Sequence, residues 1–281
     1  MSPVAYGLVL FSALLHAGWN AVLRGGDDRT WAAGWMGIAT FAVAAPLLPF
    51  VPIPAAAAWP SIAFSSGLHV IYMELLMIAY RKGELSTAYP IARGTSPVLV
   101  TLGAWLLVRE VPSPFAIAGV FIVSAGILSI ALERGHFDRL NIDRGTLIAS
   151  LLTGVTIACY TVSDGIGVRT AGNALSYNVW IFSIYGLLMT LVFIARRGTK
   201  ALKGEPRRVG LAVGGGIVSV VAYALVTMAM QHGAMGQVSA LRETSVVFAA
   251  LIGRFFLGES LQARRLAACF AVAAGAVLLA H

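Results

Sequence analysis

Residues 93–110 read RGTSPVLVTLGAWLLVRE, and residues 242–259 read RETSVVFAALIGRFFLGE. The two stretches align without a gap and share an Arg-x-Thr-Ser start, a Glu end and an apolar centre. Chance matching among Ala, Leu and Val is the alternative explanation, but the shared polar positions disfavour it. The pair therefore predicts an internal repeat, which is typical of proteins that move solutes across membranes.

The composition of the whole chain agrees with a membrane protein. Of its 281 residues 58% are hydrophobic and 11% are charged, and the mean hydropathy is +0.83. Soluble domains average about 45–50% apolar and about 25% charged residues. The difference argues against a soluble enzyme, a disordered tail, a coiled coil and a disulfide-stapled module. Cys159 and Cys269 lie in apolar runs and are interpreted as buried hydrophobes, not as a redox pair or zinc site.

The apolar runs have the length of membrane spans, which need about 20 residues each. Breaks at charges and at Pro/Gly clusters predict an all-α membrane protein with ten transmembrane helices. Their expected ranges are 3–23, 31–50, 60–80, 86–107, 113–132, 145–163, 174–195, 208–231, 235–257 and 261–280. Five helices per repeat is an odd number, so the repeat at 139–281 is expected to be inverted relative to the repeat at 1–138. The first run lacks a basic n-region and a cleavage site, which predicts a retained helix and not a signal peptide.

The positive charges lie mainly in the connectors. The net charge is +8, but this distribution argues against nucleic acid as a partner. Sixteen of the 20 Lys and Arg follow the first, third, fifth, seventh or ninth helix, and two follow the even-numbered helices. Basic loops stay on the cytoplasmic side. We therefore expect cytoplasmic odd-numbered loops and external termini in a bacterial-type inner membrane.

Four charged residues stand out inside the predicted spans, away from the span ends: Glu74, Arg93, Arg242 and Glu243. Such residues are costly in a bilayer and are functional candidates by default. Glu74 and Arg93 lie about seven residues on either side of a short turn, so equal depth would allow an ion pair. Two interpretations remain open. The charges neutralise each other and lock helices together, or one of them binds a zwitterion or relays a proton.

Polar and aromatic side chains recur at helical spacing in otherwise apolar spans. His16, Trp19 and Asn20 share one face of the first helix, and His69 and Tyr72 share one face of the third. Such stripes suit a cavity that holds an apolar side chain and hydrogen-bonds a polar end. Packing between helices and headgroup contact are the alternatives. Further candidates for substrate binding are Tyr89, Tyr160, Trp180, Tyr223 and Gln237.

Other positions bear on motion and packing. Pro97 lacks an N–H in mid-helix, so Pro97 with Gly94 is expected to form a gate hinge or a static bend. Val246 replaces this proline in the second repeat, so the halves should bend differently. Glu110 and Glu259 lie at helix ends and are expected to cap a helix or pair with loop arginines. Small residues predict close packing of 113–132 against 261–280 in a monomer, with a homodimer as the alternative.

No catalytic set is present in the sequence. It has no G-x-x-x-x-G-K loop, no H-E-x-x-H and no supported Ser/His/Asp arrangement. We therefore expect no enzyme activity, no cofactor and no metal site. Without a nucleotide site, transport would be secondary, with a small-molecule substrate and membrane lipid as the partners.

These features together resemble one family. The ten-helix pattern, His16-Ala-Gly-Trp19-Asn20, Tyr89-Pro-Ile-Ala-Arg93-Gly-Thr-Ser-Pro97 and the closing Glu110 and Glu259 resemble the EamA-type branch of the drug/metabolite transporter superfamily. The resemblance implies a central cavity lined by helices 1, 3, 4, 6, 8 and 9. The relatives that it is most similar to include bacterial exporters of amino acids, among them aromatic ones.

The combined prediction is a secondary transporter that works by alternating access around a central cavity. It would export small amphipathic metabolites, with hydrophobic or aromatic amino acids as the best candidates. One alternative is a proton-coupled exporter of cationic drugs, which should depend on an embedded acid such as Glu74. An alternative from another class is a membrane-embedded lipid-modifying enzyme.

Overall fold

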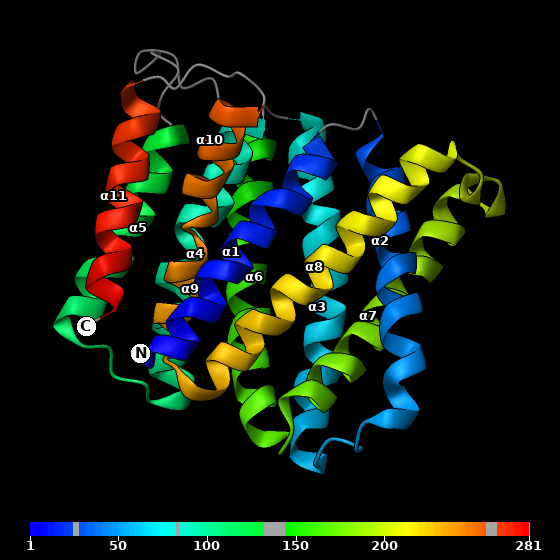
Figure 1. The fold of residues 1–281 in the computed structure, drawn as a ribbon, viewed down its shortest axis with the longest axis horizontal. Coiled ribbons are helices and arrows are strands. Elements are labelled where there is room, and N and C mark those ends of the chain that lie inside the picture. The colour runs from blue at the N-terminus through cyan, green and yellow to red at the C-terminus, as the bar shows by residue number, and fades with distance from the viewer. Residues whose placement is uncertain (25–27, 83–84, 132–143, 257–262, 281) are drawn as a thin grey trace.

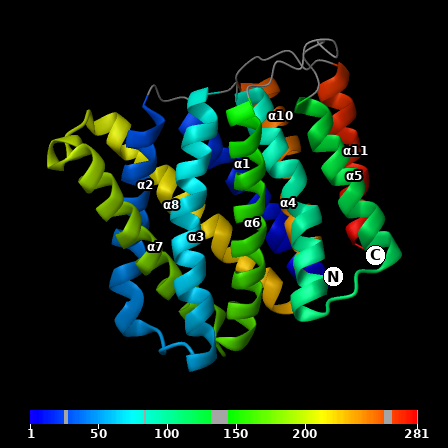
Figure 2. The ribbon, with the colours of Figure 1, turned by 180° about the vertical axis from the view of Figure 1, so that it is seen from behind.

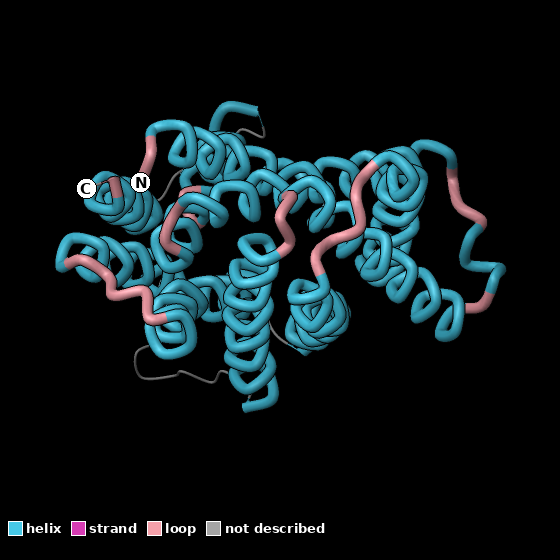
Figure 3. The backbone as a smooth tube through the Cα atoms, turned by 90° about the horizontal axis from the view of Figure 1, so that it is seen from below, coloured by secondary structure: helices cyan, strands magenta, loops and turns pink. Residues whose placement is uncertain are grey.

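The computed structural model describes residues 1–281 except 25–27, 83–84, 132–143, 257–262 and 281. The regular elements of this described part are all helical (Figure 3). In chain order they are α1 Pro3–Arg24, α2 Arg29–Ala44, η1 Ala45–Phe50, η2 Ala56–Ala58, α3 Trp59–Lys82, α4 Leu85–Val108, α5 Pro114–Ala131, α6 Arg144–Thr170, α7 Ala174–Arg197, η4 Thr199–Leu202, α8 Pro206–His232, α9 Met235–Arg242, α10 Ser245–Phe256 and α11 Ala263–Leu279.

The helices form a bundle with both chain termini at the same end (Figure 1). Helices from the two halves of the sequence alternate in it. The tightest pairings are α3 with α6, α5 with α11, α1 with α8, α4 with α6 and α2 with α7. Figure 2 shows α6 between α3 and α4, far from its sequence neighbour α5. The predicted boundary between residues 138 and 139 lies outside the described residues.

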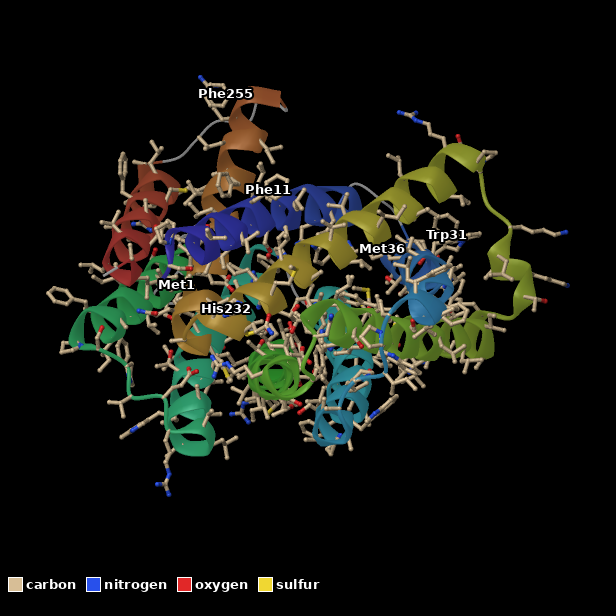
Figure 4. All side chains as sticks on the ribbon, turned by 60° about the horizontal axis from the view of Figure 1, so that its bottom comes forward. Met1, Phe11, Trp31, Met36, His232 and Phe255 are labelled. Carbon is tan, nitrogen blue, oxygen red and sulfur yellow. The ribbon has the colours of Figure 1, made fainter. Side chains whose placement is uncertain are left out.

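The outer surface of the bundle is apolar. Six helical stretches of the described chain are long and apolar enough to cross a membrane, at 29–50, 56–79, 89–108, 144–170, 174–197 and 206–232. Phe11 and Phe255 are among the many large apolar side chains that project outwards (Figure 4). Serine and threonine are buried instead, for example Ser65, Ser96 and Thr153. A bundle with an apolar exterior and polar groups inside is a multi-pass membrane protein.

Two predicted helix ends differ from the structure. The helix expected at 145–163 continues to Thr170 in α6, so Asp164 and Arg169 lie in the helix and not in a connector. The helix expected at 31–50 is α-helical only to Ala44 and continues as the 3₁₀ helix η1. Pro46 and Pro49 explain this change, because proline removes an N–H donor and its ring clashes with the preceding turn.

The helix expected at 235–257 is interrupted at Glu243 and Thr244, between α9 and α10. The N–H groups of Glu243, Thr244 and Val246 donate three residues back, at 3.0, 3.1 and 3.0 Å, instead of four. Such a tightened turn leaves backbone groups outside the regular α-helical pattern. The two aligned stretches therefore do differ in bending, but the interruption is in the stretch that lacks the proline.

The α4 helix remains continuous across Pro97. The missing N–H of Pro97 would leave the Arg93 carbonyl without its usual partner, and the Ser96 hydroxyl donates to that carbonyl at 3.2 Å. Gly94 lies against α5, where an added Cβ would be 2.7 Å from Leu128 Cγ. Close packing thus accounts for Gly94, and its role as a hinge stays a prediction.

The small residues of α5 and α11 bring these helices together, as the sequence predicts. A Cβ added at Gly119 would lie 2.9 Å from the Gly275 carbonyl oxygen, and one added at Gly275 would lie 2.9 Å from the Gly119 carbonyl oxygen. Gly126 lies against Ala271 in the same interface. Both Gly119 and Gly275 therefore approach backbone atoms, which cannot rotate away.

We expect Gly275→Ala to destabilise the protein by about 1–3 kcal/mol, because overpacking forces the two backbones apart. Thermal unfolding in detergent measures this as a lower Tm. Gly7→Ala is the matched control, since nothing lies within 4 Å of a Cβ at that position of α1. Its Tm should stay level or rise, because alanine favours the helix. Equal Tm values for the two variants would contradict the proposed close contact.

Candidate functional site

A pocket opens near the middle of the bundle, between α1, α2, α3, α6, α7, α8 and α9. It leaves about 680 Å³ free of protein atoms, including the space at its mouth. Met36, labelled in Figure 4, lies on its α2 side. The lining residues are Ser12, His16, Trp19, Met36, Thr40, His69, Tyr72, Met73, Tyr160, Phe182, Tyr185, Ser219, Ala222, Tyr223, Val226 and Arg242.

Seven of the predicted substrate-binding residues are thus brought together at one site: His16, Trp19, His69, Tyr72, Tyr160, Tyr223 and Arg242. Their helices are far apart in the sequence but converge in the bundle. The other five predicted residues, Asn20, Tyr89, Arg93, Trp180 and Gln237, do not line this pocket.

Aromatic rings form one wall of the pocket. His69 stacks on Tyr160 with centroids 4.1 Å apart, and meets the edge of Tyr223 at 5.1 Å. Tyr72 packs edge-on against Tyr160 at 5.7 Å. Such a wall offers ring faces to an apolar or aromatic group and hydroxyls to a polar one.

Arg242 is the cationic residue of this wall. It ends α9 at the helix interruption and is 2% exposed. Its Cζ lies 5.9 Å from the centroid of the Tyr223 ring. Within the described chain, Nε and Nη2 of Arg242 have no hydrogen-bond partner. A guanidinium with unused donors suits a carboxylate or another planar anion.

Arg93 forms a buried ion pair with Glu243, and not with Glu74 as predicted. The Nε of Arg93 donates to Oε2 of Glu243 at 2.8 Å, and the two side chains are 2% and 0% exposed. Tyr89 lies beside Arg93, whose Cζ is 5.8 Å from the ring centroid. The pair joins α4 to the turn between α9 and α10.

Glu74 instead pairs with Arg196 of α7, and the two side chains are 25% and 59% exposed. The prediction of a Glu74–Arg93 pair used depth alone. However, α3 packs mainly against α6 and α7 and has little contact with α4. Glu74 therefore faces α7, outside the pocket.

The remaining predicted site residues have other neighbours. Asn20 donates to the His16 carbonyl at 2.9 Å, and the Trp19 indole donates to His16 Nδ1 at 3.2 Å, both within α1. Trp180 packs edge-on against Trp59 at 4.9 Å. Gln237 lines a second pocket with Glu110.

Glu110 caps α9 and holds one end of the bundle together. It accepts from the Met235 N–H at 2.9 Å and pairs with Arg169 at 2.5 Å. Arg169 also donates to the carbonyls of Met230 and Gly233, at 2.8 and 2.7 Å. Glu110 therefore does cap a helix, but its ion-pair partner is Arg169 within α6 and not a loop arginine. Glu259 lies outside the described residues.

The sequence analysis missed Asp164, an acidic residue that lies behind the pocket. It is 0% exposed and accepts hydrogen bonds from the hydroxyls of Tyr177 and Tyr223. The predicted helix ended one residue earlier, which left Asp164 in a connector. Its signal was the apolar sequence on both sides of it, between 145–163 and 170–195.

Metal ligation has no support in the part of the chain that the structure describes, where no group of three His, Cys, Asp or Glu side chains is suitably placed. The site instead offers aromatic faces, hydroxyls and one guanidinium in a membrane-spanning bundle. These are groups that bind a small molecule reversibly.

A multi-pass helical bundle with a polar and aromatic pocket defines a membrane transporter as the class. Residues 144–280 match the EamA-like transporter family. This match to the second half of the chain supports the EamA-type branch of the drug/metabolite transporter superfamily. Members of the family are transporters and not enzymes.

Comparison with solved structures supports the fold along the whole chain. One crystal structure is similar over 99% of this chain and 96% of its own, with a TM-score of 0.78 and 17% sequence identity. No curated protein matches the sequence significantly.

Neutralising the two acids that were predicted inside the spans, Glu243 and Glu74, should have different effects on stability. Glu243→Gln leaves Arg93 buried without its counter-charge, and such a loss costs about 3–5 kcal/mol. Glu74→Gln opens a partly exposed pair worth about 0–1 kcal/mol. We expect a large fall in Tm for the first variant and a small change for the second. A similar Tm for both would contradict the assignment of Glu243 as the partner of Arg93.

Proposed function

We propose that this transporter exports small amphipathic metabolites, with hydrophobic or aromatic amino acids as its best substrates. The main support is Arg242 in the wall of the aromatic pocket, whose Nε and Nη2 have no hydrogen-bond partner among the described residues. A substrate carboxylate would bind Arg242, and the apolar side chain would pack against Tyr72, Tyr160 and Tyr223. Arg93 is the weaker candidate for the carboxylate because Glu243 already neutralises it.

The proposed architecture is ten spans in two inverted repeats, residues 1–138 and 139–281. The packing supports it, because replacing each helix by its counterpart in the other half turns several contacts into contacts that are also present. In this exchange the first five helices correspond in order to the last five, and α9 and α10 together count as the ninth. The α1–α8 contact then becomes the α6–α3 contact, and the α4–α6 contact becomes the contact of the ninth helix with α1. The α2–α7, α5–α11 and α4–α9 contacts map onto themselves.

The proposed mechanism is alternating access, in which the two halves rock around the pocket. The helix interruption at Glu243 and Thr244 supports this, because transporters place such breaks beside their substrate sites. We also propose a monomer, since the small residues of α5 and α11 are used within one chain. Gly94 and Pro97 remain the proposed hinge.

The proposed location is a bacterial-type inner membrane, with the odd-numbered loops in the cytoplasm and the termini outside. The distribution of charge supports this orientation. Arg29, Arg144, Arg197 and Arg254 belong to helix ends at the side of the bundle opposite the termini. Of the described arginines, Arg109 and Arg169 lie toward the end with the termini.

The alternative of a cationic-drug exporter loses its support from Glu74. That residue lies outside the pocket and is paired with Arg196. The pocket wall instead presents Arg242, which would repel a cation. An anionic group on the substrate is therefore favoured.

Uptake by vesicles that contain the purified protein tests the proposal. We expect uptake of radiolabelled phenylalanine or leucine, and a loss of apparent affinity of about 10- to 100-fold in Arg242→Gln, because hydrogen bonds to charged groups contribute about 1.5–3 kcal/mol. Arg196→Gln is the matched control, an arginine outside the pocket, and should retain affinity. The amide of phenylalanine lacks the carboxylate and should be insensitive to Arg242→Gln. Absence of uptake of every amino acid by the wild-type protein would overturn the proposed substrate class.

A further inference from the structure

Asp164 and Glu243 are both buried acids, but they are hydrogen-bonded by different kinds of group. In Asp164, Oδ1 accepts from the Tyr177 hydroxyl at 2.8 Å, and Oδ2 accepts from the Tyr223 hydroxyl. Among the described residues no Arg or Lys forms an ion pair with Asp164. Its two hydrogen-bond partners are therefore both hydroxyls.

Hydroxyl partners allow the carboxyl group to gain or lose a proton in place. A hydroxyl donates to a carboxylate and can accept from a carboxylic acid, whereas a guanidinium only donates. Glu243 is thus held as an anion by Arg93. Asp164 can be charged or neutral without movement of its neighbours, and a charge without a cationic partner is costly at this depth.

Tyr223 connects Asp164 to the pocket. It lines the pocket, its ring lies 5.9 Å from Arg242 Cζ, and its hydroxyl donates to Asp164. While it donates to the carboxylate, its oxygen can only accept from a ligand. When Asp164 is protonated and donates to Tyr223, the tyrosine hydrogen is released and can point at the ligand.

Several titratable or charged groups face this pair. They are His69 on α3, Tyr160 on α6, Tyr177 and Tyr185 on α7, and Arg242 on α9. His69 is bonded through Nδ1 to Ser65, at 2.9 Å to its carbonyl and 3.2 Å to its hydroxyl. Asp164 and Arg242 both act electrostatically on His69, with opposite sign. Tyr223 therefore lies between the carboxyl group of Asp164 and the cationic guanidinium of Arg242.

We propose that Asp164, acting through Tyr223, selects substrates with an ammonium group and exchanges that group for a proton. This inference rests on the proposed function, in which Arg242 binds the carboxylate of the same molecule. With Asp164 ionised, Tyr223 accepts from the ammonium. A proton taken from water neutralises Asp164, turns Tyr223 into a donor and releases the ammonium. The substrate class is thus a zwitterion, and one proton replaces one substrate. Asp164 is a positioning residue, since Tyr223 makes the contact.

Equilibrium binding to the purified full chain, measured across mildly acidic to mildly alkaline pH, tests the inference. The probes are phenylalanine and 3-phenylpropionate, which has the carboxylate but no ammonium. We expect the wild-type Kd for phenylalanine to rise about tenfold or more as the pH falls, the scale of one hydrogen bond to a charged group. The Kd for 3-phenylpropionate should not rise.

Three variants test whether Asp164 is the group that binds the exchanged proton. Asp164→Asn and Tyr223→Phe should both bind phenylalanine weakly at every pH, and Tyr223→Phe preserves the ring packing if the first variant folds poorly. Tyr177→Phe is the matched control, because it removes a hydroxyl from the same carboxyl but does not line the pocket. Its affinity for phenylalanine should still depend on pH.

Four outcomes would overturn the inference. Binding of both probes with no pH dependence would overturn it and leave the proposed function intact. A pH dependence that persists in Asp164→Asn would assign the proton to His69 instead. Loss of the pH dependence in Tyr177→Phe would give Asp164 a purely structural role. Failure of the wild-type protein to bind either probe would overturn the proposed function together with this inference.

Discussion

The ion pair between Arg93 and Glu243 is the constraint on which the centre of the structure depends. Both side chains are removed from solvent, so each requires the other. The pair fixes α4 against the ninth helix at the position where that helix is interrupted. Arg93 donates to Oε2 of Glu243, and the neighbouring Arg242, which lines the pocket, has donors without a partner among the described residues. The buried ion pair thus holds α4 to the turn between α9 and α10, and Arg242 beside it is the cation that a ligand can reach.

Much of the fold could be predicted from the sequence because apolar length and charged connectors are local signals. The bounds of α1, α4, α7 and α8 lie close to the predicted ranges for this reason. The interruption at Glu243 has no such signal, since neither proline nor glycine lies there. It depends on where Arg93 meets Glu243, which is a tertiary contact. The continuity of α4 at Pro97 depends likewise on the Ser96 hydroxyl.

The candidate site was predictable in its residue types and less so in its pairings. Polar–aromatic stripes indicated His16, His69 and Tyr72, which do line the pocket. Depth in the membrane follows from position along a helix, but the direction in which a side chain points does not. Glu74 and Arg93 were therefore matched wrongly. Asp164 was missed because the predicted helix ended where the uncharged run ends, at residue 163, whereas α6 continues to Thr170.

The separation of Arg93 and Glu243 has a consequence for biosynthesis. The two residues lie 150 positions apart, so Arg93 enters the membrane long before its counter-charge has been made. An arginine costs up to about 2.5–3.5 kcal/mol at the centre of a span. The apolar residues of α4 must therefore offset the cost of Arg93 until Glu243 has been made and can pair with it. Correct assembly is decided late, when nearly all of the chain has left the ribosome.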